Sequence, residues 1–227
     1  MPLEPWPVLA RRAAEGRYAL GYFESWNLES LQGVLDAAEE TRSPVIVGFN
    51  GEFMSRAGRR TRERLACYAG LGRAAAGSAA VPCALIFNEC GQDDWTREAM
   101  TLGFTMVGVA GGTDGLPDYA RRCATLVRQA SARGVCVEAE VGELPCGATG
   151  RVVEEGASVT DPEEAARFAG ETGIGLLAVS VGNVHIMVEG ERGLDLARLE
   201  AIRRRVDVPL VLHGGSGIAA GPLREAI

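Results

Sequence analysis

The sequence predicts an α/β protein of the TIM or (β/α)8-barrel class, built as a single domain over residues 1–227. Short apolar runs without strict alternation are typical of strands buried on both faces of a parallel sheet. Amphipathic helix patterns lie between these runs, so strand and helix alternate at intervals of roughly 25 to 40 residues. The chain is a little shorter than the roughly 250 residues typical of such a barrel.

Seven apolar runs are the expected strands, and each is rich in Val, Ile, Leu or Ala. They are Tyr18–Phe23, Pro44–Phe49, Pro82–Phe87, Thr105–Val109, Val135–Glu140, Leu176–Val181 and Pro209–His213. Beyond the seventh run, a glycine-rich turn and a helix start lead to Ile227. These residues are too few for an eighth strand, which we therefore expect to be missing. Because a seven-stranded barrel would leave two unpaired strand edges, we also expect the domain to be C-terminally incomplete.

The expected helices carry their own boundary signals. Asn27 is a candidate N-cap for Leu28–Thr41, and Asp161 with Pro162 opens a later helix. The remaining helices are Trp6–Glu15, Arg62–Ala75, Trp95–Leu102, Asp118–Arg133, Glu163–Thr172 and Leu194–Arg205. The first strand is not followed by the G-x-G-x-x-G pattern, which disfavours an open dinucleotide-binding sheet.

Composition excludes several classes of function. A net charge of -7 without a basic run argues against nucleic acid as a partner. The chain contains no stretch of about 20 apolar residues, so a membrane span is not expected. Met1–Trp6 lacks a signal-peptide pattern, and we therefore expect a cytoplasmic protein. The chain has no lysine. Schiff-base aldolase and pyridoxal-phosphate chemistry are thereby excluded, because arginine stays protonated.

The six cysteines form no C-x-x-C pair, which disfavours a zinc ribbon or a thioredoxin-type motif. They are Cys67, Cys83, Cys90, Cys123, Cys136 and Cys146. We expect reduced, buried thiols that act as small hydrophobic residues. Cys90 differs from the others because it stands beside Glu89. It could serve as a metal ligand, but a buried thiol without a ligand role is favoured.

Both histidines of the chain fall where a barrel places its active site, at the C-terminal ends of strands. His185 follows the sixth expected strand and His213 ends the seventh. Because neighbouring strands lie about 4.8 Å apart, the two imidazoles can meet at one ion. A single histidine is more often structural, but this paired placement favours a divalent metal, with zinc first and manganese or iron as alternatives.

Two further patterns accompany the histidines. The turn at His213–Gly217 combines unhindered backbone N–H groups with a serine hydroxyl, which makes it a candidate phosphate cradle. Glu138 and Glu140 lie on one side of the fifth expected strand and would repel each other unless a cation lies near. The structural alternative is that one is ion-paired inside the barrel and the other is solvated.

The segments Val137–Gly142, Thr160–Ala165, Gly182–His185 and the His213 turn resemble the class II fructose- and tagatose-bisphosphate aldolases. The likeness runs nearly the whole chain. It implies a zinc ion held by three histidines, of which His185 and His213 match the second and third. It also implies that Glu140 can hold the metal in an outward position. The implied phosphate-binding positions are Gly182, Gly214, Gly215 and Ser216.

This sequence departs from the family pattern at the first zinc-binding histidine and at the catalytic aspartate. Asn88 stands where the family has the aspartate, and Glu89 stands at the histidine, which leaves a possible His2Glu metal site. An asparagine cannot transfer a proton as a carboxyl group does. Other departures are Ala110 and Gly112 for an acid and a serine, and Ile186–Val188 where the family has a basic residue. Candidate general bases are Glu138, Glu24 or a metal-bound water.

The hypothesis that follows is a metal-dependent aldolase-type lyase of carbohydrate metabolism such as glycolysis, acting on a phosphorylated ketose. Asn88 and Ala110 keep a second hypothesis open, a catalytically weak barrel used for binding or regulation. A metal hydrolase is a third, because His2Glu sites also activate water. The resemblance implies a homodimer or homotetramer.

Overall fold

The structure is a computed structural model that describes residues 2–56, 58, 61–111, 115–145, 158–185 and 190–227. The chain divides into two compact units, Met1–Glu138 and Ala139–Ile227. Strand β5, Cys136–Val141, runs across the boundary between them.

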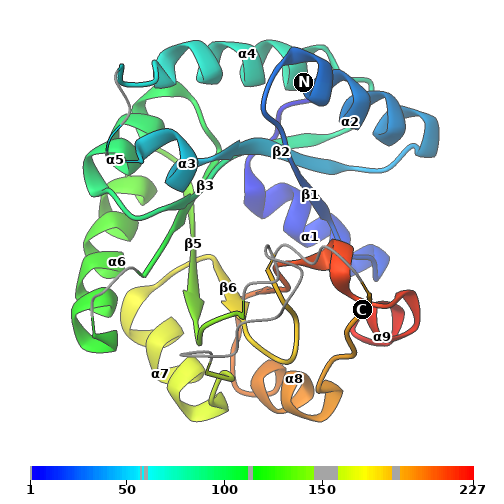
Figure 1. Ribbon diagram of the computed structural model, residues 1–227, viewed down its shortest axis with the longest axis vertical. Helices are drawn as coiled ribbons and strands as arrows, with labels where there is room; N and C mark the ends of the chain where they lie inside the picture. Colours follow the sequence, from blue (N-terminus) through cyan, green and yellow to red (C-terminus); the bar gives the residue numbers. More distant parts are fainter. Residues whose placement is uncertain (1, 57, 59–60, 112–114, 146–157, 186–189) are drawn as a thin grey trace. The chain divides into compact units, whose positions relative to one another are not determined.

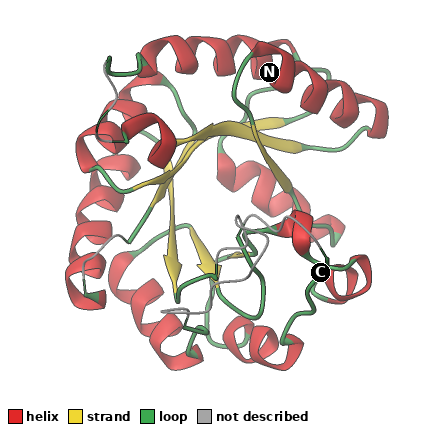
Figure 2. Ribbon diagram, viewed as in Figure 1, coloured by secondary structure: helices red, strands yellow, loops and turns green. Residues whose placement is uncertain are grey.

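Strands and helices alternate along the first unit (Figures 1 and 2). Its strands before β5 are β1 (Gly21–Glu24), β2 (Val45–Asn50), β3 (Cys83–Cys90) and β4 (Met106–Val109). Its helices are α1 (Trp6–Gly16), α2 (Leu28–Thr41), α3 (Gly51–Ser55), α4 (Leu65–Ser78), α5 (Asp93–Leu102) and α6 (Leu116–Ser131).

The strands of the first unit pair in chain order, and every pairing from β1 to β4 is parallel. All residues of β2 and β4 are buried, as the continuous apolar runs predicted. The register places Asn50, the last residue of β2, opposite Asn88 of β3. Polar side chains thus follow the apolar strands at the same carboxyl edge of the sheet.

The second unit repeats the alternation on a smaller scale. Strands β6 (Leu176–Val179) and β7 (Leu210–Val211) pair in parallel. The helices are α7 (Pro162–Thr172), α8 (Leu196–Arg203), the 3-10 turn η1 (Gly215–Gly217) and α9 (Ala220–Glu225). Within the residues that the structure describes, seven strands are present, as the sequence predicted.

The predicted helix caps are confirmed. The Asn27 side chain accepts a hydrogen bond from the Ser30 N–H, and the Ser30 hydroxyl accepts one from the Asn27 N–H, which forms a capping box. Asp161 accepts from the N–H groups of Glu163 and Glu164 at the start of α7. Gly173, with φ 68°, ends α7.

Element boundaries differ from the predictions where local hydrogen bonds compete with strand pairing. The predicted strand Tyr18–Phe23 begins only at Gly21, because the Tyr18 N–H still donates to Ala13 O and thereby closes α1. Helix α3 was not predicted. It forms because the Asn50 side chain accepts a hydrogen bond from the Phe53 N–H at 3.1 Å, and its five residues are too few to show a helical period.

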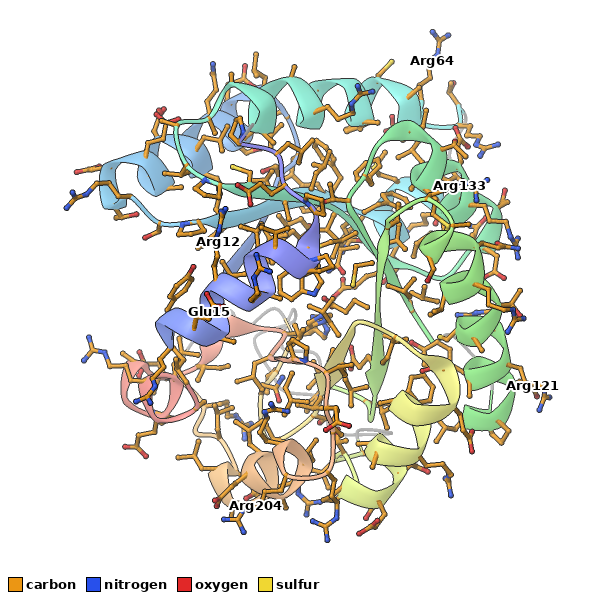
Figure 3. All side chains as sticks on the ribbon, turned by 180° about the vertical axis from the view of Figure 1, so that it is seen from behind. Arg12, Glu15, Arg64, Arg121, Arg133 and Arg204 are labelled. Carbon is orange, nitrogen blue, oxygen red and sulfur yellow. The ribbon has the colours of Figure 1, made fainter. Side chains whose placement is uncertain are left out.

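Charged side chains lie on the outer faces of the helices. Arg121 of α6 and Arg204 after α8 project away from the ribbon (Figure 3), and both side chains are more than two-thirds exposed. Among the described residues, no helix combines the length and the apolar character needed to cross a bilayer.

Candidate functional site

The two histidines of the second unit lie side by side. The Nδ1 atom of His213 and the Nε2 atom of His185 are 3.4 Å apart, and the ring planes meet at 79°. Two ligand atoms placed about 2.0–2.1 Å from a tetrahedral zinc lie roughly 3.3–3.4 Å apart. The two nitrogens therefore have the spacing of neighbouring corners of one coordination shell. Their role as metal ligands stays a prediction.

A buried asparagine holds the two histidine segments together. Asn183 donates from Nδ2 to the backbone oxygens of Val179 and His213, at 3.2 and 3.1 Å. Its Oδ1 accepts a hydrogen bond from the Val181 N–H at 2.9 Å. Asn183 thus ties the end of β6 to the backbone of His213. In the sequence, Asn183 stands out only as part of a family segment, and nothing local indicates its cross-strand role.

Glycine is required at two positions of this turn region for reasons of packing. Gly214 has φ 70°, and a Cβ there would lie 2.0 Å from the carbonyl oxygen of Val184. Gly182 has φ 102°, a left-handed backbone that side chains other than glycine's rarely adopt. By contrast, Gly215 and Ser216 are exposed, and a Cβ on Gly215 would meet nothing within 4 Å. The predicted phosphate-binding role of all four residues stays a prediction.

Glu140 lies against His213, with 3.5 Å between a carboxylate oxygen and Nδ1. A carboxylate beside an imidazole fixes the orientation and tautomer of the ring. The strand end that carries Glu140 is held by Thr160, whose hydroxyl donates to Val141 O at 2.5 Å and accepts from Ser180 N–H at 2.7 Å. Thr160 is a positioning residue that the sequence patterns indicated only as the first residue of a family segment.

Glu89 of the first unit has an unusual backbone. Its φ of 50° is left-handed, and the pairing of β3 with β4 shifts register between Phe87 and Cys90. Such a bulge redirects a side chain at the end of a strand, and left-handed backbone in a non-glycine residue costs about 1–3 kcal/mol. The Asn50 Nδ2 donates to a Glu89 carboxylate oxygen at 2.7 Å. The local fold thus orients the Glu89 carboxylate, whose place at the family's first histidine stays a prediction.

Asn88, the predicted catalytic position, is almost completely buried, with 3% of its surface exposed. Its Oδ1 has no hydrogen-bond partner and packs where a Cβ on Gly108 would approach to 2.3 Å. An unmade hydrogen bond of this kind costs about 1–3 kcal/mol. A catalytic role for this side chain stays a prediction.

A phenol and three carboxylates form a second group in the first unit. The Tyr22 hydroxyl is buried without a hydrogen-bond partner. Burial, together with the charges of Glu24, Glu89 and Glu138, raises the Tyr22 pKa well above its ordinary value of 10, so the phenol stays protonated. Glu138 is itself buried. Tyr22 was missed by our sequence reasoning, although it lies two residues from Glu24 on one strand, a spacing that places both on one face.

Glu24, one of the candidate general bases, is a carboxylate whose protonated form is favoured. Burial raises its pKa above the ordinary 4.5, the Glu89 charge acts in the same direction, and a hydrogen bond from Asn50 opposes both. A carboxyl group whose pKa is raised toward neutral pH is better suited to exchange protons at that pH.

Among the cysteines that the structure describes, Cys83, Cys90 and Cys123 are buried as predicted, and Cys136 is partly buried. Burial raises the pKa of Cys83 to about 11 and of Cys123 and Cys136 to about 12. Cys90 is buried, its thiol donates to Gln92 O at 3.3 Å, and burial raises its pKa as well. Cys67 is exposed, and the prediction that it is buried was wrong, because it faces outward from α4.

Three predictions fall outside the described residues. They concern Cys146, Gly112 and Ile186–Val188. Ala110, at the end of β4, is described. Its N–H donates to Cys90 O, and as an alanine it offers no acid at the position where the family has one.

Comparison with known proteins identifies the family. The model of the class II fructose-bisphosphate aldolases matches residues 7–227. The chain therefore belongs to the class II fructose-bisphosphate aldolase family, as the sequence predicted.

Individual relatives agree with this membership. The chain is 35% identical to a fructose-bisphosphate aldolase of Geobacillus stearothermophilus, over 100% of this chain and 78% of that protein. It is 33% identical to a 6-phospho-5-dehydro-2-deoxy-D-gluconate aldolase of Halalkalibacterium halodurans, over 100% of this chain and 77% of that protein.

A solved structure confirms the fold class. The crystal structure of the YdjI aldolase from Escherichia coli K12 superposes with a TM-score of 0.82 at 29% identity, covering 99% of this chain and 77% of that one. The fold is thus of the (β/α)8-barrel type, with seven strands in the part of this chain that is described. The relatives differ in the substrates that their names state, so family membership alone does not define the substrate.

Proposed function

We propose that this protein is a metal-dependent aldolase-type lyase that cleaves or forms a carbon–carbon bond in a phosphorylated ketose. Family membership supports the reaction class. The single geometric observation that carries the proposal is the 3.4 Å separation of the His185 and His213 nitrogens. Two converging imidazoles are the donor set that zinc and related divalent ions prefer.

The ligand set that we propose is His185 and His213, with Glu89 in place of the family's first histidine. The Asn50 hydrogen bond and the left-handed backbone support this role for Glu89, because they orient its carboxylate. Glu140 lies against His213 and is the candidate for the outward metal position. When bound, a divalent ion would act as a Lewis acid on the substrate carbonyl.

Proton transfer is assigned to the carboxylates of the first unit. Glu138 and Glu24 are the candidate bases that remove the proton of the substrate hydroxyl as the carbon–carbon bond breaks. The raised pKa of Glu24 supports its inclusion. The Tyr22 phenol, which stays protonated, can donate a hydrogen bond to a substrate oxygen.

The phosphate of the substrate is assigned to the turn after β7. The exposed backbone of Gly215 and the hydroxyl of Ser216 are the accessible donors there. Gly214 and Gly182 contribute by allowing the turn to pack closely. We also propose a homodimer or homotetramer, as the family resemblance implies, which light scattering of the purified protein would test.

One observation favours a second candidate function, a metal-binding barrel with little catalysis. Asn88 is a buried amide at the position where the family has its catalytic aspartate. Without a replacement for that acid, the loss of general acid–base catalysis reaches roughly 10²- to 10⁴-fold. The protein would then bind a metal and a sugar phosphate with little turnover.

The test measures bound metal by mass spectrometry after dialysis, together with cleavage of fructose 1,6-bisphosphate and related ketose phosphates. Wild type is expected to retain about one divalent ion per chain, and His185→Ala and His213→Ala to lose both the ion and turnover. Cys67→Ser is the matched control, because it removes the exposed thiol, a potential adventitious zinc ligand, and should retain both.

Two results would contradict the proposal. If the metal stays bound in both His185→Ala and His213→Ala, the two histidines are not its ligands. Metal binding without turnover on any ketose phosphate would favour the second candidate function instead.

A further inference from the structure

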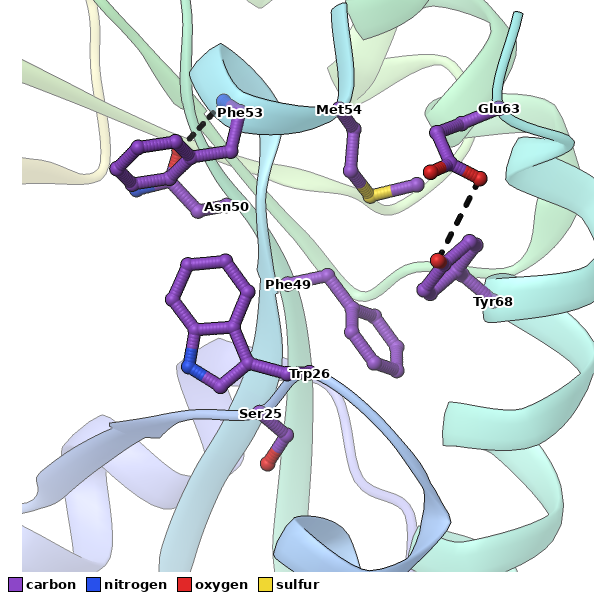
Figure 4. A pocket seen from close by; sticks show the side chains of 8 residues that line it. All are labelled: Ser25, Trp26, Phe49, Asn50, Phe53, Met54, Glu63 and Tyr68. Carbon is purple, nitrogen blue, oxygen red and sulfur yellow. Dashed lines mark hydrogen bonds between the residues drawn. The ribbon is translucent and has the colours of Figure 1, made fainter. Parts of the chain in front are cut away.

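A small aromatic pocket lies at the carboxyl end of β2 in the first unit (Figure 4). Its volume is about 70 Å³, and a single water needs roughly 10–15 Å³ by the same measure, so it has room for a group of a few heavy atoms. The residues lining it come from the β1–α2 turn, the end of β2, α3 and the start of α4. They are Ser25, Trp26, Phe49, Asn50, Phe53, Met54, Glu63 and Tyr68.

Aromatic rings form most of the pocket wall. Trp26 and Phe53 have ring centroids 5.3 Å apart, and Phe49 and Tyr68 have centroids 5.2 Å apart. The Met54 side chain extends between these pairs (Figure 4). Such a wall favours a ligand group with exposed C–H bonds, because aromatic rings bury apolar surface at little cost in conformational entropy.

The outer wall of the pocket is left uncovered. Trp26 is 57% exposed, whereas Trp6 and Trp95 are buried. Phe23 and Leu28, from the same short segment, are also exposed. An exposed aromatic at the rim of a pocket is typical of a surface that a ligand covers.

The pocket is joined to a proposed metal ligand by one residue. Asn50 lines the pocket and donates from Nδ2 to Glu89 at 2.7 Å, while its Oδ1 accepts from the Phe53 N–H. Asn50 thus lies between the aromatic wall and the Glu89 carboxylate and contacts both.

The charge of the lining limits what this end of the substrate can be. Among the lining residues, one is a carboxylate, Glu63, and none is Arg, Lys or His. Arg56 stacks over the Phe53 ring, 5.0 Å from its centroid, and is paired with Glu52. A phosphate placed among the rings would lose its hydration without a cationic lining partner.

We propose that this pocket is a specificity subsite for the substrate end remote from the phosphate, and that it selects an uncharged, short aldehyde chain with an apolar face. The inference rests on the proposed lyase function. It assigns the protein to ketose monophosphates whose aldehyde half is an alkyl or deoxy chain, rather than to bisphosphates.

The kinetic test runs the reaction in the direction of bond formation, with dihydroxyacetone phosphate and three aldehydes. These are butyraldehyde, glyceraldehyde and glyceraldehyde 3-phosphate. We expect kcat/KM for butyraldehyde to exceed that for glyceraldehyde 3-phosphate by about tenfold or more, because one desolvated phosphate outweighs a few apolar contacts.

Variants of the wall then separate the pocket from the rest of the site. Trp26→Ala and Phe53→Ala should lower kcat/KM for butyraldehyde by roughly 10- to 100-fold and leave glyceraldehyde 3-phosphate nearly unchanged. Trp26→Arg should invert the preference, since it adds a cation at an exposed position. Phe23→Ala is the matched control, an exposed aromatic of the same segment that does not line the pocket.

A binding measurement tests the pocket without turnover. Of the three tryptophans, Trp26 alone is exposed, so a saturable blue shift of tryptophan emission on titration with 1-butanol, an unreactive analogue of butyraldehyde, reports its occupancy. The shift should be lost in Phe53→Ala and kept in Phe23→Ala.

The outcomes distinguish the two proposals. A preference for glyceraldehyde 3-phosphate, or equal losses for all aldehydes in Trp26→Ala, overturns the subsite. If no aldehyde is turned over, the lyase proposal fails, and the fluorescence titration alone decides the subsite: a saturable, Phe53-dependent blue shift supports it and its absence overturns it.

Discussion

The histidine region of the second unit and the carboxylate region of the first unit are built by different means. His185 and His213 follow strand ends, where Asn183 and Gly214 hold the backbone in one arrangement. Glu24, Glu138 and Tyr22 lie on strands, and burial together with neighbouring negative charge raises the pKa of Tyr22 and of Glu24. The comparison teaches that the proposed metal ligands depend on backbone packing, whereas the proposed proton-transfer groups depend on electrostatics.

The positions where the sequence departs from the family pattern touch both sides of this comparison. By the family resemblance, Asn88 stands at the catalytic aspartate and Glu89 at the first metal-binding histidine, and both lie at the end of β3. We therefore expect this chain to differ from its family in one proposed metal ligand as well as in proton transfer.

The largest expected effect comes from restoring the family acid. Asn88→Asp should raise kcat for ketose-phosphate cleavage by roughly 10²- to 10⁴-fold if proton transfer limits the wild-type rate. Asn88→Ala, the control for the altered packing beside Gly108, should not raise it. An unchanged kcat in Asn88→Asp would mean that Glu24 or Glu138 already carries this step.

The next effect tests the backbone on the histidine side. Gly214→Ala should lower the free energy of unfolding by about 3 kcal/mol or more and abolish metal retention, because a Cβ would overlap the Val184 carbonyl oxygen at φ 70°. Gly215→Ala, with open space around it, should change stability by less than about 1 kcal/mol. Urea unfolding and metal analysis of both variants decide it, and equal behaviour of the two would contradict the packing argument.

A smaller effect is expected at the asparagine that joins the histidine segments. Asn183→Ala should cost about 1–3 kcal/mol of stability, because it removes three hydrogen bonds of a fully buried side chain. Metal affinity should fall as well, measured by competition with a chelator. Asn183→Asp is the informative companion, since it keeps the acceptor and loses the donor. Unaltered affinity in both variants would show that the histidines are positioned by other contacts.

The electrostatic side predicts a pH dependence. Because the folded-state pKa of Glu24 is raised, the folded chain binds more protons there than the unfolded chain, so its contribution to stability is greatest below about pH 4.5 and falls as pH rises through the folded value. Glu24→Gln should therefore be more stable than wild type at neutral pH, with the difference shrinking toward pH 4. Thermal unfolding across this range measures it, and a difference that grows at low pH would contradict the assignment.

The smallest expected effect concerns the rates at which the cysteine thiols react, and it involves no change of stability. At pH 8, maleimide should label Cys67 quickly and leave Cys83, Cys123 and Cys136 unlabelled, because burial raises their pKa values and withholds the thiolate. Peptide mapping by mass spectrometry gives the sites. Rapid labelling of Cys136 in native protein would show that its strand opens readily.

The alternation of strand and helix, the cap residues Asn27 and Asp161, and the family were all predictable from sequence, because they depend on residues close together in the chain. The strand limits were less predictable. The Tyr18 N–H donates to Ala13 O of α1 instead of to a neighbouring strand. No local pattern of side chains indicates which of these two hydrogen bonds forms. Helix α3 escaped prediction because a single contact from Asn50 initiates it.

By itself, the sequence determined which residue types were available: two histidines, no lysine, and the pair Asn88 and Glu89 at the end of the third strand. It also determined the fold, since apolar periodicity is a property of the chain. The tertiary structure alone decided that Tyr22 is an unpartnered phenol among carboxylates and that Trp26, Phe49 and Phe53 enclose a pocket beside Asn50. Burial and charge at these positions arise from residues far apart in sequence, whose proximity exists only once the strands have paired.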